Sequence, residues 1–184
     1  AREGERLGNA VVPPGKIGMA SVCSIVINGT LLKAGVPMDS RFGGILQMRK
    51  GQPLRFVELI SYSGSSLDPS EVFIRGKMTS VHSAVTEGEG KILANFREIP
   101  ALCKPIAENT IARLREACLK GLVLMGNPSE PLCEIPVGVN RVGMVLLGGL
   151  NPVAVAEEMG IQTENQAMST TMEFSKFRPI WEIA

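Results

Sequence analysis

Aromatic residues, histidine and long apolar segments are scarce in this chain of 184 residues. Aromatic residues make up 4% of it and histidine occurs once. The longest apolar stretches, Gly121–Met125 and Val142–Leu150, fall far short of the roughly 20 residues that cross a bilayer. Four of the first six residues are charged, and the segment lacks the apolar core of a secretory signal. The sequence therefore predicts a soluble cytoplasmic protein without a membrane partner.

The chain also lacks an excess of positive charge. It has 19 Lys and Arg against 18 Asp and Glu, which gives a net charge of +1. Binding to nucleic acid requires a concentrated excess of cations that neutralises phosphates. A nucleic-acid surface on this segment is therefore not expected.

Metal and nucleophile motifs are missing too. The four cysteines are far apart and form no Cys-x-x-Cys pair: Cys23, Cys103, Cys118 and Cys133. This spacing argues against a zinc site, and plain thiols are expected. His82 is the only histidine, and no Gly-x-Ser-x-Gly motif accompanies it. No catalytic residue, metal or cofactor is predicted.

Hydrophobic residues make up 45% of the chain, and 20 glycines and 12 prolines divide it into short elements. Two stretches repeat at a constant offset. Pro14–Met19 followed by Lys33–Val36 matches the stretch from Val137 to Met144 followed by Glu158–Ile161. We infer pseudo-repeats at about residues 10–60 and 135–184, joined by a helix–strand–helix–strand segment at 68–125.

Each repeat is expected to contain a buried strand, a short helix ended by glycine and a β-hairpin. In the first repeat these are Ile17–Ile27, a helix ending at Gly35, and Gly44–Arg49 with Leu54–Ile60. In the second they are Arg141–Leu147, a helix ending at Gly160, and Ala167–Phe174 with Pro179–Ile183.

The segment between the repeats starts with a helix signal: Asp68 as N-cap, Pro69 at the first position and Glu71 in capping-box spacing. The helix is expected to reach Thr86. A strand at Lys91–Phe96, a helix at Pro100–Lys120 and a strand at Gly121–Met125 are expected to follow. The fold class is α/β, with a mixed sheet and helices packed on it. No counterpart of this segment precedes the first repeat, so a fragment of a longer chain is expected.

The turn before the second-repeat helix is one candidate anion site. Gly148 and Gly149 precede a helix that opens at Asn151-Pro152, and backbone N–H groups at a helix N-terminus attract anions. A tight strand-to-helix turn without a ligand explains the same pattern.

Three other places could bind a carboxylate. Arg41 stands beside Gly43 and Gly44, where a guanidinium could grip a carboxylate with two bonds. Ser65 and Ser66 lie in the hydroxyl-rich turn Ser61-Tyr62-Ser63-Gly64-Ser65-Ser66, which could supply donors to an oxyanion. Arg97 follows a buried strand, next to Glu98. An exposed loop arginine, an ordinary turn and a surface ion pair are the respective alternatives.

Several motifs resemble the effector domain of the NrpR family, archaeal repressors of nitrogen-fixation and glutamine-synthetase genes. They are Ser21–Gly29, Ser40–Gly44, Glu58–Tyr62, Ser66–Pro69, Lys77–Ser80, Gly90–Pro100 and Gly148–Pro152. The resemblance covers essentially the whole chain. It implies a homodimer that responds to 2-oxoglutarate and reaches DNA only through a winged-helix domain, which this chain does not show.

The resemblance favours a non-enzymatic domain that binds 2-oxoglutarate to relieve repression. Such a ligand needs an arginine or lysine and several N–H or O–H donors. The expected ligand-binding residues are Arg41, Gly43, Gly44, Ser65, Ser66, Arg97, Gly148, Gly149 and Asn151. An enzyme acting on a small carboxylate or phosphate is the alternative.

Overall fold

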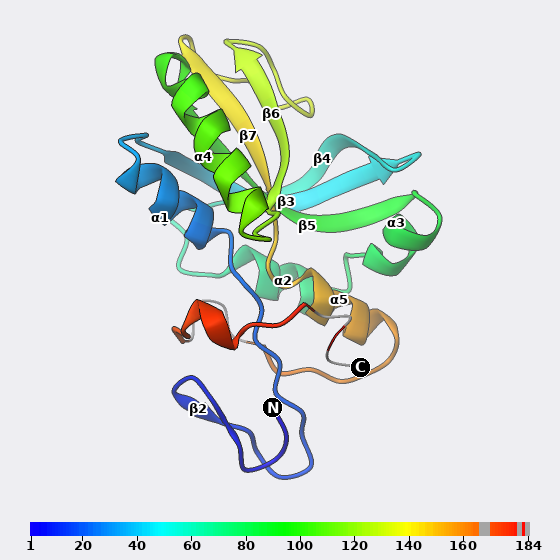
Figure 1. The fold of residues 1–184 in the computed structure, drawn as a ribbon. Coiled ribbons are helices and arrows are strands. Elements are labelled where there is room, and N and C mark those ends of the chain that lie inside the picture. Colours follow the sequence, from blue (N-terminus) through cyan, green and yellow to red (C-terminus); the bar gives the residue numbers. More distant parts are fainter. Residues whose placement is uncertain (166–169, 180–181, 183–184) are drawn as a thin grey trace. The chain divides into compact units, whose positions relative to one another are not determined.

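A computed structural model describes residues 1–165, 170–179 and 182 (Figure 1). The chain divides into two compact units, one formed by residues 1–21 and 168–184 and the other by residues 22–167. The second unit contains a five-stranded sheet and the five α-helices found in the described residues.

The sheet has the strand order β4-β3-β5-β7-β6. Its strands are β3 (Asp39–Arg49), β4 (Gln52–Ser61), β5 (Gly90–Pro100), β6 (Leu122–Pro128) and β7 (Arg141–Leu147). The predicted α/β class is confirmed, but the four strand pairs are antiparallel rather than mixed. The helical connections join β4 to β5 and β5 to β6. In both cases a strand of opposite direction, β3 or β7, lies between the joined strands, so parallel neighbours do not arise.

Five α-helices accompany this sheet: α1 (Ile25–Lys33), α2 (Pro69–Arg75), α3 (Val81–Thr86), α4 (Lys104–Glu116) and α5 (Asn151–Glu158). α1 and α4 pack on the face that carries Ile99 and Met144. α2 meets the same face at Gly43, where an added Cβ would lie 2.8 Å from the Cβ of Pro69. The opposite face carries three packed rings, Phe42, Phe56 and Phe96, and is covered by the segment between β6 and β7.

The first-repeat strand predicted at Ile17–Ile27 is wrong. Residues 17–22 contain no strand, and Ile25–Lys33 forms α1. The run of β-branched residues favours a strand by local propensity, but burial of one helical face against the sheet favours a helix. Ile27 and Leu31, one helical turn apart, are both buried against the sheet. The strand Arg141–Leu147 of the second repeat is confirmed as β7.

Both predicted helix ends are confirmed. Gly35 follows α1 with φ +81°, and Gly160 follows α5 with φ +80°. This left-handed conformation suits glycine, and it lets the N–H of Val36 bond to the carbonyl of Leu31 in a Schellman motif. The first-repeat hairpin is confirmed as β3 and β4, with a turn at Lys50-Gly51.

The predicted helix at Pro69–Thr86 is wrong as one element, because it divides into α2 and α3. The N-cap is confirmed: Asp68 Oδ1 accepts a hydrogen bond from the Glu71 N–H at 3.1 Å. α2 ends at Arg75, and Lys77 has a φ of +52° that no α-helix continues through. The downstream helix begins with a short 3-10 turn, η1 (Ala101–Cys103), before α4.

The smaller unit contains a short hairpin of β1 (Arg6–Leu7) and β2 (Ala10–Val11). The Asn9 N–H donates to Thr170 Oγ1 at 3.0 Å. The second-repeat hairpin is not found in the described residues, since 170–173 are irregular and Phe174–Lys176 forms a 3-10 helix, η2. The remainder of that predicted hairpin, residues 167–169, 180–181 and 183, lies outside the described residues.

Candidate functional site

A buried arginine lies in the centre of the sheet. Arg97 belongs to β5, the middle strand, and is 4% exposed. Its Nε and Nη1 atoms are buried and have no hydrogen-bond partner within the described part of the protein. A buried cation without a partner carries a large desolvation penalty. An anionic ligand would remove that penalty by accepting hydrogen bonds from both nitrogens.

A chain of polar side chains surrounds Arg97. The Arg97 guanidinium carbon lies 4.9 Å from the centre of the Tyr62 ring, a cation–π contact. The Tyr62 hydroxyl donates to Asn95 Oδ1, and Asn95 Nδ2 donates to Ser24 Oγ at 3.2 Å. These contacts connect the end of β4, the middle of β5 and the start of α1. Four polar groups therefore meet on the helix-covered face of the sheet.

Tyr62 reports the electrostatics of this cluster. Burial raises the pKa of its hydroxyl above the ordinary value of 10.0, whereas the nearby charge of Arg97 and a hydrogen bond with the Arg97 side chain act in the opposite direction. Asp68 and Cys23 also act on this pKa, which places the start of α2 and the segment before α1 near the ring. The tyrosine therefore remains a neutral hydrogen-bond donor at physiological pH.

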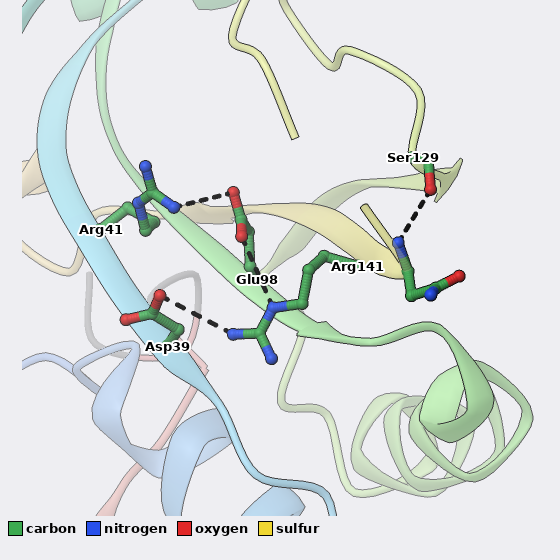
Figure 2. A network of polar contacts seen from close by, with 6 residues as sticks. Asp39, Arg41, Glu98, Ser129 and Arg141 are labelled. Atoms are coloured by element: carbon green, nitrogen blue, oxygen red, sulfur yellow. Dashed lines mark hydrogen bonds and ion pairs between the residues drawn. The ribbon is translucent and has the colours of Figure 1, made fainter. Parts of the chain in front are cut away.

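Arg41, the second predicted arginine, lies on the other face of the sheet. It occupies a bulge in β3, where Ser40 pairs with Arg97 and Phe42 pairs with Phe96. Its Nη1 donates to Glu98 Oε1 at 3.2 Å (Figure 2). Successive side chains of a strand point to opposite faces, so Glu98 and Arg97 point apart. The structure does not bring the two arginines to one ligand.

Glu98 is the centre of an ion-pair network on that second face. It is 2% exposed, and its Oε2 lies 3.6 Å from Arg141 Nε. Arg141 Nη2 in turn lies 3.7 Å from Asp39 Oδ2 (Figure 2). The network connects β3, β5 and β7. The surface ion pair considered for Arg97 and Glu98 is wrong: both residues are buried, and Glu98 pairs with Arg41 and Arg141 instead.

Gly43 and Gly44 allow close packing on the two faces of β3. A Cβ on Gly43 would lie 3.1 Å from the Tyr62 hydroxyl and 2.8 Å from Pro69. A Cβ on Gly44 would lie 2.6 Å from the carbonyl oxygen of Glu58. Gly43 thus borders the Arg97 cluster, whereas Gly44 faces away from it.

The side chain of Asn151 is used within the protein. Its Oδ1 accepts from the Leu93 N–H, and its Nδ2 donates to the carbonyls of Leu93 and Gly148, each at 2.9 Å. β7 pairs with β5 only as far as Ala94, so the amide continues the ladder where β7 has ended. Asn151 has no donor left for a ligand in this conformation.

The remaining predicted ligand-binding residues are Gly148, Gly149, Ser65 and Ser66. A Cβ on Gly148 would clash with the backbone of Leu93, and a Cβ on Gly149 would lie 2.9 Å from the Val22 carbonyl, next to the segment that leads to Ser24. Ser65 Oγ accepts from the Leu67 N–H at 3.2 Å, a local turn contact, and Ser66 is exposed.

The expected ligand-binding residues leave out three members of the cluster, Tyr62, Asn95 and Ser24, although Tyr62 lies within the predicted hydroxyl-rich turn. A signal was present for one of them. Asn95 and Arg97 alternate along a strand whose other residues are apolar from Ile92 to Phe96, and polar side chains at alternate buried positions indicate a polar site. Tyr62 and Ser24 reach the cluster only through the packing of β4 and α1.

Other features of the described residues lie apart from the cluster. A surface pocket of about 410 Å³ between α1 and α4 is lined by Thr30, Lys33, Ala34, Thr110, Arg113 and Leu114. His82 is exposed on α3, and its backbone N–H donates to Glu158. No group of three potential metal ligands occurs in the described ranges. None of the helices described is long and apolar enough to cross a membrane.

Known proteins resemble this chain over most of its length. The family model for NrpR regulatory domains NRD1 and 2 matches residues 1–179. The global nitrogen regulator NrpRI of Methanosarcina mazei is 40% identical over 169 residues, which are 92% of this chain and 52% of the relative. The global nitrogen regulator NrpR of Methanocaldococcus jannaschii is 31% identical over 168 residues, 91% of this chain and 29% of the relative.

A solved structure agrees with these relatives. The crystal structure of a nitrogen repressor-like protein from Methanococcus jannaschii has a TM-score of 0.65 and 32% identity, over 80% of this chain and 61% of the other. The present chain thus spans about half or less of the length of the two regulators. With its match from residue 1 to residue 179, the chain belongs to the family of NrpR regulatory domains NRD1 and 2.

Proposed function

We propose that this domain is the effector sensor of a nitrogen repressor and that it binds 2-oxoglutarate through Arg97. The coarser part of the function rests on the family: the relatives are global nitrogen regulators, and the matched region is regulatory. In the proposal, binding of the keto acid relieves repression, DNA is contacted by a part of the protein outside this chain, and the domain works as a homodimer without catalysis.

The observation that supports the proposal is that two buried nitrogens of Arg97, Nε and Nη1, have no hydrogen-bond partner in the described part of the protein. Its Nε and Nη1 atoms are buried donors that point in different directions, so each can donate to a separate acceptor of an anionic ligand. Tyr62 and Asn95 supply neighbouring polar groups on the same face. Arg41 is not included, because Glu98 on the opposite face already holds it.

The site requires the ligand to reach a position between the sheet and α1. In the proposal the ligand lies next to the Ser24–Asn95 contact and the Tyr62 ring. A ligand enclosed by elements as separate as α1, β4 and β5 would alter their packing when it binds. Such a change is what a regulatory domain must pass on to the rest of a repressor.

Calorimetric titration of the chain with 2-oxoglutarate tests the proposal. Succinate and glutamate serve as controls for the carboxylates and for the keto group. Saturable binding that prefers the keto acid, without consumption of the ligand, is the expected result. Absence of binding, or turnover of the keto acid, would refute the proposal in its present form.

A further inference from the structure

A second buried polar atom without a partner lies on α1. Asn28 Oδ1 is buried and has no hydrogen-bond partner in the described part of the protein. The same condition holds there for Nε and Nη1 of Arg97 and for Asn165 Oδ1. Most buried polar atoms in proteins find a partner, so an unpaired atom calls for an explanation. Three of these four atoms belong to Asn28 and Arg97.

The direction of α1 relative to β5 indicates that Asn28 lies at the level of Arg97. Ser24 Oγ contacts Asn95 at the start of α1, and β3 begins shortly after α1 with Asp39 paired to Glu98. α1 therefore runs along β5 in the same direction. Four helical residues advance by about 6 Å and two strand residues by about 6.6 Å. The step from Ser24 to Asn28 thus matches the step from Asn95 to Arg97.

The packing of α1 supports this register. Ile27 and Leu31, which flank Asn28 on the buried side of the helix, pack in one cluster with Ile99. Asn28 lies one helical turn after Ser24 and is flanked by two members of this cluster. Arg97 occupies the corresponding place on β5, between Asn95 and Ile99. Both residues are therefore at one level of the same interface.

Their chemistry is complementary to a substituted carboxylic acid. Arg97 offers donors to a carboxylate. The amide of Asn28 can accept a hydrogen bond through Oδ1 or, after a half-turn about its terminal bond, donate one through Nδ2. A keto oxygen beside the carboxylate would receive that donated bond, whereas an unsubstituted methylene would leave the amide unpaired. Discrimination is strong when a buried polar group is left without its partner.

We propose that Asn28 is a specificity-determining residue that recognises the keto substituent next to the carboxylate bound by Arg97. The inference rests on the proposed function, because it needs the acid to bind at Arg97. The inference names Asn28 as the residue by which the protein distinguishes a 2-oxo acid from the unsubstituted acid of the same length.

The test compares 2-oxoglutarate with glutarate, which lacks only the keto oxygen, in the full chain and in Asn28→Leu. Leucine fills a similar volume and removes both polar atoms. The variant is expected to lose about tenfold in affinity for 2-oxoglutarate, the cost of leaving one hydrogen bond unmade, and to bind glutarate as the wild type does. Asn127→Leu, at an exposed amide on β6, is the control and should change neither affinity.

Two results would overturn the inference and leave the proposed function standing. In one, Asn28→Leu weakens 2-oxoglutarate and glutarate equally, which indicates a packing effect. In the second, Asn28→Leu changes the affinity for neither acid, which indicates that only water joins Asn28 to Arg97. If the wild-type chain binds neither acid, the proposed function fails and the inference fails with it. Asn28→Ser, a smaller polar variant compared on the same two acids, decides the matter if the leucine variant does not fold.

Discussion

Arg97 and Glu98 are neighbours on β5, and both are buried. Two nitrogens of Arg97 have no hydrogen-bond partner in the described part of the protein. The carboxylate of Glu98, in contrast, forms ion pairs with two arginines, Arg41 and Arg141. They point to opposite faces of the sheet. Glu98 has its charge compensated inside the protein. Arg97 has two nitrogens without such a partner. This difference supports a structural role for Glu98 and the proposed binding role for Arg97.

Replacing Glu98 by glutamine should destabilise the domain without changing ligand affinity. The substitution removes the anion that holds Arg41 and Arg141 to β5. The expected loss in the free energy of unfolding is about 1–3 kcal/mol, less than for a fully enclosed pair because both arginines are partly exposed. Urea denaturation of E98Q measures it. An unchanged midpoint would show that the network adds nothing to stability.

Asn151→Asp should lower the stability of the domain more than an Asn→Asp substitution at an exposed position. Aspartate can still accept from the Leu93 N–H, but it cannot donate to the carbonyls of Leu93 and Gly148. Two buried carbonyls would face a carboxylate, and a loss of about 2–4 kcal/mol is expected. Thermal unfolding of N151D against N127D checks this. Equal melting temperatures would mean that the amide does not continue the β5 ladder.

The ionisation of Tyr62 should be displaced to high pH. Its pKa is raised by burial, so the neutral hydroxyl is the form that the folded state favours. Its contribution to stability is complete below pH 10.0, the ordinary pKa, and is lost as the pH rises through the raised value. Tyr62 is the only tyrosine in the chain, so ultraviolet titration of the phenolate reports this site alone.

Two variants check the cause of that shift. Arg97→Met should raise the pKa of Tyr62 further, because the charge of Arg97 lowers it. Tyr62→Phe should lose less stability than the wild type between neutral and alkaline pH. A fall of the Tyr62 pKa in R97M would contradict the placement of the guanidinium over the ring.

Elements with strong local signals could be predicted from the sequence. The Asp68 cap, the glycines that end α1 and α5, and the Lys50-Gly51 turn each depend on chemistry within a few residues. α1 could not be predicted from the sequence. Its β-branched residues favour a strand, and they become helical only because one face of the helix is buried against the sheet.

The sequence indicated Arg97 as a candidate residue, but it did not show where Arg41 and Asn151 lie, because their positions depend on tertiary structure. Arg97 was identified as a residue that follows a buried strand, whereas it lies within β5. The sequence does not show which face of the sheet a side chain occupies once a bulge intervenes. The bulge at Arg41 turns that arginine to the face of Glu98. The use of Asn151 within the ladder depends on where β7 ends, which is a tertiary property.

The most direct test of the account compares Arg97→Met with Arg41→Met in calorimetric titrations with 2-oxoglutarate. Methionine keeps much of the apolar stem of arginine and removes the charge. R97M should abolish binding and retain its melting temperature, because an unpaired buried charge has been removed. R41M should bind as the wild type does. Binding that survives in R97M, or that is lost in R41M, would contradict the assignment of the effector site to the Arg97 face.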